Sequence, residues 1–165
     1  MGKANRSEEW GIGKANRSEE WAKGEARLAH LGVIVRRLDA AEPFYARLGL
    51  SPARRVSLDR ERVRMTFIRV ADAEIELLEP AAQEGPLSRF LATRGEGIHH
   101  IAIEVDDIER ALALATASGM RAIDQVPRPG AHGTRVAFLH PGQAHGVLLE
   151  LVERPRHPPR EEPST

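Results

Sequence analysis

The chain has 165 residues, with 24 Lys or Arg balanced by 24 Asp or Glu, and it contains no cysteine. The balanced charge gives no reason to expect a nucleic acid partner, and the missing thiols exclude disulfides, thiolate metal sites and cysteine nucleophiles. No apolar run reaches membrane-spanning length, so the composition predicts a cytoplasmic protein with no membrane partner. Any metal site must therefore use His, Asp, Glu or neutral oxygen ligands.

The two ends of the chain have the character of appended segments. The motif GKANRSEEW occupies residues 2–10 and recurs unchanged at residues 13–21. Old structural repeats diverge, so this identity indicates a recent duplication or an added stretch, and we predict an N-terminal extension over 1–27. Pro-rich sequence predicts a loose tail over 155–165. A single domain is then expected over 28–154.

The segment HLGVIVRRLDAAEPFYARLGL, residues 30–50, predicts a strand, a turn and an amphipathic helix that stops at a glycine. Pro43 is expected near the start of this helix, where its missing N–H matters least. Three further strands are predicted in the sequences SPARRVSL, RMTFI and IELLEP. PLSRFLATRG then predicts a linking helix, with Pro86 at its first position and Gly95 just past its end.

A diverged copy of this pattern begins 70 residues later. HIAIEVDDIERALALATASGM, residues 100–120, aligns with residues 30–50 without a gap, and Asp107 is the expected N-cap of its helix. AIDQVP is predicted as a short strand, RVAFL aligns with RMTFI, and LELVER aligns with IELLEP. The repeat predicts an α+β fold of two pseudo-symmetric βαβββ modules, over about 28–84 and 96–154. Together they would form a half-open mixed β-barrel cup.

Two adjacent histidines in GIHHIAIEV raise the question of which one points into the cup. Successive strand residues face opposite ways. His100 has the same phase as His30 in the aligned strand, opposite the bulky aliphatic residues expected beneath the helices. His99 aligns with Ala29 on the other face, so we predict that His99 is a structural neighbour.

One carboxylate from each half has a matching phase. Glu76 and Glu150 occupy aligned positions in IELLEP and LELVER and point away from the aliphatic face. Two imidazoles and two carboxylates suit a borderline divalent metal and leave coordination positions for a substrate. Taken singly, each such residue is more often a rim or solvated strand residue, so the hypothesis depends on their matched occurrence in both halves.

Four segments resemble the methylmalonyl-CoA epimerase family in order along the chain, namely EIELLEP, GEGIHHIAIEVDDI, PRPGAHGTRVAFLHP and GVLLELVE. That family is part of the vicinal oxygen chelate superfamily, whose architecture is the glyoxalase/bleomycin-resistance fold. The resemblance implies one divalent metal ion, either cobalt, manganese, nickel or zinc, and a homodimer. It also implies the metal ligands, which are His30, Glu76, His100 and Glu150.

The resemblance further implies an isomerase that interconverts the epimers of methylmalonyl-CoA by removing and returning the α-proton through a metal-stabilised enolate. Glu150 is our first choice for the catalytic carboxylate and Glu76 is the second. Several bacterial members of the family carry an acid/base glutamate where this chain has Met65, which transfers no proton. Which group replaces that glutamate is left open.

The loop PRPGAHGTRV leaves two interpretations open. Arg128, His132 and Arg135 either line the acyl or CoA side of the cup or belong to a solvated hairpin, so no substrate-binding residue is assigned. Two other functions are also weighed. A different metal-dependent isomerase or lyase of the superfamily, such as a lactoylglutathione lyase, is disfavoured by the motifs outside the ligands. A non-catalytic ligand-sequestering protein is disfavoured by the four filled ligand positions.

Overall fold

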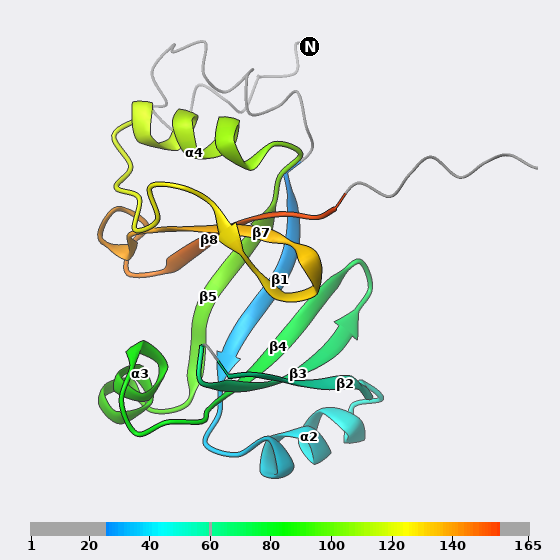
Figure 1. Ribbon diagram of the computed structural model, residues 1–165. Coiled ribbons are helices and arrows are strands. Elements are labelled where there is room, and N and C mark those ends of the chain that lie inside the picture. The colour runs from blue at the N-terminus through cyan, green and yellow to red at the C-terminus, as the bar shows by residue number, and fades with distance from the viewer. Residues whose placement is uncertain (1–25, 60, 156–165) are drawn as a thin grey trace, which may run out of the picture.

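A computed structural model describes residues 26–59 and 61–155 of the chain (Figure 1). The duplicated motif and the Pro-rich stretch after residue 155 lie outside the described residues, so the predicted domain boundaries stay predictions. Within the described ranges, no helix is long and apolar enough to cross a membrane. The strands and α-helices, in chain order, are β1 (Arg27–Ile34), α2 (Leu38–Arg47), β2 (Pro52–Leu58), β3 (Val63–Val70), β4 (Ala73–Pro80), α3 (Pro86–Arg94), β5 (Gly97–Glu104), α4 (Ile108–Ala117), β6 (Arg128–Pro129), β7 (Arg135–Leu139) and β8 (Leu148–Glu153).

All the strands belong to one curled, mixed sheet with the order β2-β3-β4-β1-β5-β8-β7-β6. The first strands of the two repeats, β1 and β5, pair antiparallel along its middle. Each of them also pairs in parallel with the closing strand of its own half, β1 with β4 and β5 with β8. The strand order is therefore the same when read outward from the centre in either direction. This arrangement confirms the predicted α+β fold of two pseudo-symmetric modules.

Two helices cover the outer face of the sheet, one for each half (Figure 1). Under α2 lies a buried cluster of Val35, Leu38, Ile68 and Leu77, with Val33 and Ile75 packed against it. Under α4 the cluster is formed by Ile108, Ala111, Leu112, Ala115, Ala137, Leu139 and Leu151. Both clusters include strand positions that alternation assigned to the helix side, such as Val35, Leu77 and Leu151. The opposite, inner face holds the polar residues of interest. Helix α3 links the two halves, beginning at Pro86 with Gly95 just past its end, as predicted.

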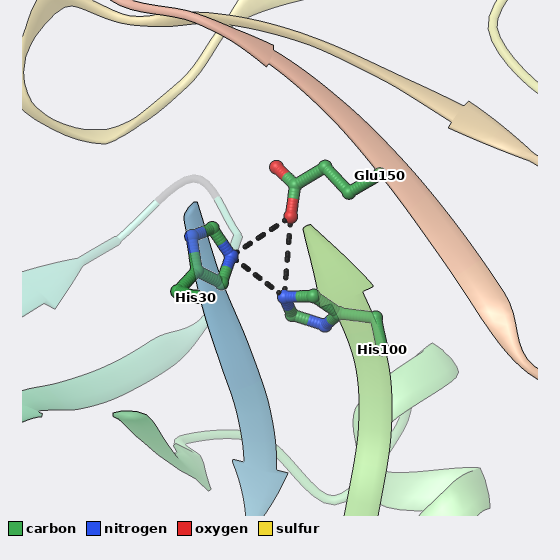
Figure 2. Close-up of side chains that lie close together, drawn as sticks. All are labelled: His30, His100 and Glu150. Carbon is green, nitrogen blue, oxygen red and sulfur yellow. Dashed lines mark hydrogen bonds and ion pairs between the residues drawn. The ribbon is translucent and has the colours of Figure 1, made fainter. Parts of the chain in front are cut away.

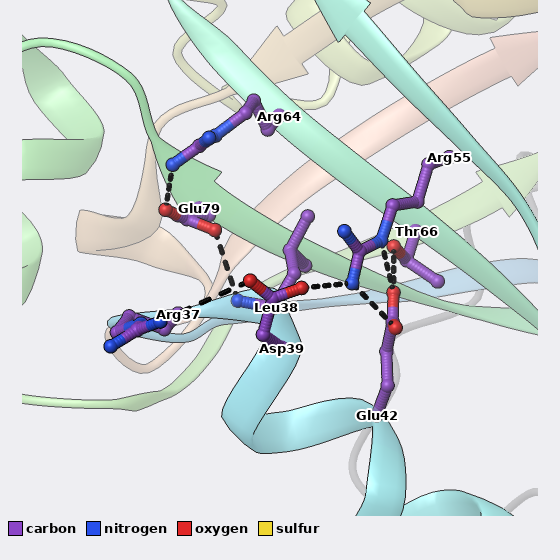
Figure 3. Close-up of polar contacts among 8 residues, drawn as sticks. All are labelled: Arg37, Leu38, Asp39, Glu42, Arg55, Arg64, Thr66 and Glu79. Carbon is purple, nitrogen blue, oxygen red and sulfur yellow. Dashed lines mark hydrogen bonds and ion pairs between the residues drawn. The ribbon is translucent and has the colours of Figure 1, made fainter.

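The start of each outer helix is held by a glutamate from the closing strand of the same half. The Leu38 N–H of α2 donates to Glu79 Oε2 at 2.9 Å, and the Ile108 N–H of α4 donates to Glu153 Oε2 at 3.1 Å. Glu79 also forms an ion pair with Arg64, as Figure 3 shows. A carboxylate at a helix N-terminus satisfies a free N–H group and is favoured by the helix dipole. Asp107 additionally caps α4 by accepting from the Arg110 N–H, which confirms that prediction.

Pro43 lies inside α2 rather than near its start, so that prediction is wrong. The helix begins at Leu38 because Glu79 accepts the N–H of that residue from across the sheet. A tertiary contact therefore sets the start of the helix, and the helix tolerates the absence of a backbone N–H at Pro43.

The segment AIDQVP, residues 122–127, does not form the predicted strand. It makes one isolated bridge, between Ala122 and Leu139, and the paired strand β6 comes later and is two residues long. Backbone pairing is limited to a few bonds such as Ile123 N–H to the Phe138 carbonyl, because the Asp124 carboxylate accepts the Phe138 N–H at 2.9 Å in place of a backbone carbonyl. Pro127 and Pro129 also lack the N–H groups that a longer strand needs.

Candidate functional site

Three buried side chains from both halves meet on the inner face of the sheet (Figure 2). His30 comes from β1, His100 from β5 and Glu150 from β8, and their exposed fractions are 8%, 5% and 6%. The two Nε2 atoms lie 3.0 Å apart, and each lies 3.1 Å from Glu150 Oε2. These two nitrogens and one oxygen form a triangle of potential ligand atoms at the centre of the site.

The backbone register explains this convergence. In the antiparallel pair of β1 and β5, His30 lies opposite Ala102 and His100 lies opposite Gly32. A Cβ built on Gly32 would lie 2.2 Å from His100 Cε1, so the imidazole occupies the space that any other side chain would need. The pseudo-twofold repeat therefore places each histidine across from a small residue, and both rings can turn toward the shared centre.

Glu76 lies at the edge of this triangle. It is 7% exposed, and its Oε2 atom is 3.5 Å from His30 Nε2. Its strand pairs it with Gly32 on one side and with Phe67 on the other. Of the four residues singled out in the sequence, the structure thus brings three within mutual ligand distance and places Glu76 beside them.

The electrostatics of the cluster distinguish the two carboxylates. Burial acts to raise the pKa of Glu150, but hydrogen bonds from His100 and His30 prevail and hold it at about 2. Burial raises the pKa of Glu76, and the attraction of His30 only partly offsets this effect. Burial lowers the pKa of His30, yet the hydrogen bond to Glu150 and the charge of Glu76 leave it raised overall.

The donor set fits a divalent metal ion. His30, His100 and Glu150 aim two imidazole nitrogens and a carboxylate oxygen at one another, and these atoms compete for the same protons unless a cation lies among them. Adjacent ligands at about 2.1 Å from an octahedral ion lie about 3.0 Å apart, which matches the 3.0–3.1 Å separations found here. Glu76 Oε2, 3.5 Å from His30 Nε2, is near enough to supply a fourth ligand, which would be the second oxygen of the set.

His99 does not lie apart from the site on the opposite face, which corrects the prediction from simple alternation. The pairing of β1 with β5 shifts by one residue between His100 and Ile98, so His99 is the extra residue of a β-bulge. Its ring packs edge-on against Phe90 of α3, and its Nδ1 atom lies 3.0 Å from Nδ1 of His100. Burial, together with the charge of His100, lowers the pKa of His99 to about 4.

Two further side-chain pairs line the inner face, and of their four members the sequence analysis singled out only Arg128. The Arg54 guanidinium lies 5.6 Å from the Phe67 ring centroid, and the Arg128 guanidinium lies 5.2 Å from the Phe138 ring centroid. Phe67 is the cross-strand partner of Glu76, and Phe138 is that of Glu150. The alignment of RMTFI with RVAFL could have revealed the phenylalanines, whereas the arginines sit in segments that the repeat aligns poorly.

His132, in the loop after β6, and Arg135, the first residue of β7, have different surroundings. His132 contacts Arg54 and packs at 4.8 Å against the Phe67 ring, so this loop of the second half reaches the first half. Arg135 instead forms ion pairs with Glu109 and Glu153 beside α4 on the outer face. His132 is therefore placed at the rim of the cup, and Arg135 is not.

Met65 is buried on the inner face, in an apolar cluster with Ile34, Val63 and Leu78. Helix α3 packs over this cluster through Phe90 and neighbouring side chains. The position offers no proton-transfer group, so the titratable groups nearest the centre are the histidines and glutamates described above.

Comparison with known families matches residues 29–138 to the Glyoxalase/Bleomycin resistance protein/Dioxygenase superfamily. The chain belongs to this superfamily. Among similar proteins, the mitochondrial methylmalonyl-CoA epimerase of Dictyostelium discoideum is 36% identical over 130 residues, which cover 78% of this chain and 78% of the relative. The ethylmalonyl-CoA/methylmalonyl-CoA epimerase of Cereibacter sphaeroides is 37% identical over 130 residues, covering 77% and 97%.

The fold of the superfamily is also found in a solved structure of methylmalonyl-CoA epimerase in complex with methylmalonyl-CoA and NH4+. That structure aligns with a TM-score of 0.73 and 34% identity, covering 78% of this chain and 94% of the other. The similarity therefore extends over both halves of the repeat, and not only over the histidine-bearing strands.

Proposed function

We propose that this protein is a methylmalonyl-CoA epimerase with a metal centre formed by His30, Glu76, His100 and Glu150. The observation that carries the proposal is the convergence of three buried ligand atoms, one from each of β1, β5 and β8, within 3.1 Å. Relatives that bear this name align over 77–78% of the chain. Site chemistry and similarity therefore favour the same activity.

The chain supplies a mixed nitrogen and oxygen ligand set, which suits cobalt, manganese, nickel or zinc. When bound, such an ion supplies Lewis-acid stabilisation of the negative charge that develops on substrate oxygen as the α-proton leaves. The surrounding residues hold the ligands in place, since His100 fills the space above Gly32 and Glu150 Oε2 lies 3.1 Å from Nε2 of both imidazoles.

Epimerisation requires two proton transfers on opposite faces of the α-carbon. One base removes the proton while the electron pair of the C–H bond delocalises into the thioester carbonyl, and one acid returns a proton to the other face. Glu76 and Glu150 lie on the closing strands of opposite halves, at positions related by the pseudo-twofold repeat. A substrate between the halves would meet one carboxylate on each side, so this pair can replace the acid/base group that Met65 does not provide.

The test is the activity of purified protein that has been stripped with a chelator and then reloaded with each of the four metals. We expect metal-dependent conversion of one methylmalonyl-CoA epimer into the other. Turnover of the hemithioacetal of methylglyoxal and glutathione, without epimerisation, would instead support the lactoylglutathione lyase alternative. Tight binding of the thioester without any turnover would support a sequestering protein.

Two properties implied by family resemblance stay predictions. We expect a homodimer, which sedimentation equilibrium would detect as a mass near twice that of the 18.2 kDa chain. We also expect the protein in the cytoplasm, which fractionation of the source cells would test.

A further inference from the structure

His99 makes a contact that the proposed metal centre does not use. Its Nδ1 atom lies 3.0 Å from Nδ1 of His100, on the side of that ring away from Glu150. Two ring nitrogens at this distance share one proton, so one of them donates and the other accepts. The direction of this hydrogen bond decides which nitrogen of His100 has a free lone pair.

Only one direction is compatible with metal binding at the cluster. His100 presents Nε2 to His30 and Glu150, and Nε2 can bind a metal only if it carries no proton. In the neutral ring the proton must then sit on Nδ1, which makes His100 the donor and His99 the acceptor. The reverse direction would put the proton of His100 on Nε2 and block that ligand.

We propose that His99 is a positioning residue that selects the metal-binding tautomer of His100 by accepting its Nδ1–H. This inference rests on the proposed metal centre and deepens it. Hydrogen bonds to the second ring nitrogen commonly fix both tautomer and ring orientation of a histidine ligand. The β-bulge is what makes the contact possible, because regular alternation would send His99 to the opposite face.

The pseudo-symmetric half shows that the bulge itself does not need an imidazole. The pairing of β1 with β5 has a second register shift at Ala29, the position aligned with His99. The side chain at that bulge is only a methyl group. Ala29 is fully buried in an apolar cluster with Ala102 and Val152. Filling space at the bulge therefore does not require a histidine, and it does not account for the His99 Nδ1 atom that lies 3.0 Å from His100 Nδ1.

The experiment compares two variants of His99 that separate the hydrogen bond from ring packing. His99→Phe keeps an aromatic ring beside Phe90 but has no acceptor, whereas His99→Asn loses the ring and can place an amide oxygen near the position of Nδ1. Nitrogen-15 NMR of the histidine rings in metal-free protein reports the tautomer of His100, and titration with Co²⁺ reports metal affinity. Thermal unfolding of each variant verifies that it is folded.

We expect His100 to carry a proton on Nδ1 in the parent and in His99→Asn, donated to the acceptor at position 99. His99→Phe should shift the proton toward Nε2 and weaken Co²⁺ binding by about 10- to 100-fold, while His99→Asn retains affinity within a few fold of the parent. A parent His100 that carries no proton on Nδ1, or a His99→Phe variant with unchanged Nδ1 protonation and Co²⁺ affinity, would overturn the inference. The tautomer is read without metal, so a parent that binds no Co²⁺ would refute the metal centre while the NMR result still decides the role of His99.

Discussion

Gly32 and His100 face each other across the two central strands, and the ring of His100 lies where a Cβ of Gly32 would be, 2.2 Å from its Cε1 atom. The contact joins the two halves of the repeat at the centre of the cluster. Gly32 does not have a positive φ, so backbone conformation does not require glycine there. The requirement comes from the His100 ring, which leaves no space for a side chain at position 32. Ala102 is the corresponding small residue opposite His30.

Replacing Gly32 with alanine should therefore damage the metal centre more than the fold. The added methyl group displaces the His100 ring from its place beside His30, so we expect a loss of at least tenfold in affinity for a divalent metal, as for other disturbed ligands. The matched control is Val33→Ala, which removes packing under α2 on the other face. That change should cost about 1–3 kcal/mol of stability and leave metal affinity intact. Calorimetric metal titration and urea unfolding separate the two effects, and equal metal affinity in Gly32→Ala and parent would contradict the geometry.

His100→Ala should greatly reduce binding of a divalent metal, since it removes one of the three convergent ligand atoms. His145→Ala is the control, because that histidine is exposed in the loop before β8. Equilibrium dialysis followed by elemental analysis would show about one metal ion per chain in the control and far less in His100→Ala. Equal loading of both variants would mean that the metal is held elsewhere.

Glu150→Gln should lose most of its α-proton exchange even when loaded with metal. The amide keeps the shape of the carboxylate and an oxygen for ligation, but it cannot accept a proton at neutral pH, and removal of a general base lowers rates by about 10²–10⁴-fold. Thioester binding should persist. Glu76→Gln tests the second carboxylate in the same way, and Glu109→Gln on the outer face of α4 is the control. Near-normal exchange in Glu150→Gln would restrict that residue to holding the metal.

Glu42, which lies away from the site, is expected to make a pH-dependent contribution to the free energy of unfolding. Hydrogen bonds from Arg55 keep the pKa of Glu42 below its ordinary value of 4.5 (Figure 3). Burial acts to raise this pKa, whereas a hydrogen bond from the hydroxyl of the fully buried Thr66 lowers it further. A lowered carboxylate pKa stabilises the fold above about pH 4.5, and this contribution is lost as the pH falls through the folded-state value.

Glu42→Gln should accordingly be less stable than the parent by about 0.5–1 kcal/mol at pH 7, the smaller figure reflecting the half-exposed Arg55. The difference should shrink as the pH is lowered toward 3. Urea unfolding in steps across this range measures it. A difference that stays constant with pH would show that shape, and not charge, stabilises this contact.

The internal repeat explains why so much of the fold could be predicted. A constant spacing of 70 residues aligned His30 with His100, and two-residue alternation then separated their face from the aliphatic positions that α2 and α4 cover. Both rules are local, because they depend on strand geometry and on burial beneath an amphipathic helix.

The departures depend on contacts between distant segments. The bulge that turns His99 toward His100 is a matter of hydrogen-bond register between β1 and β5, which alternation within one strand does not reveal. The position of Pro43 inside α2 follows from Glu79, which reaches the helix start from β4. The meeting of Arg54 with His132 likewise joins loops and strands of opposite halves.

Proton exchange at the α-carbon of the substrate tests the proposed epimerase activity most directly. The metal-loaded protein would be incubated with a single epimer of methylmalonyl-CoA in deuterated water, and mass spectrometry and NMR would follow deuterium at that carbon together with the epimer ratio. An epimerase that uses the cluster of His30, His100 and Glu150 should incorporate one deuterium per molecule as both epimers approach equal amounts, and chelated protein should do neither. A metal-loaded protein that leaves the α-proton and the epimer unchanged would contradict the proposed function.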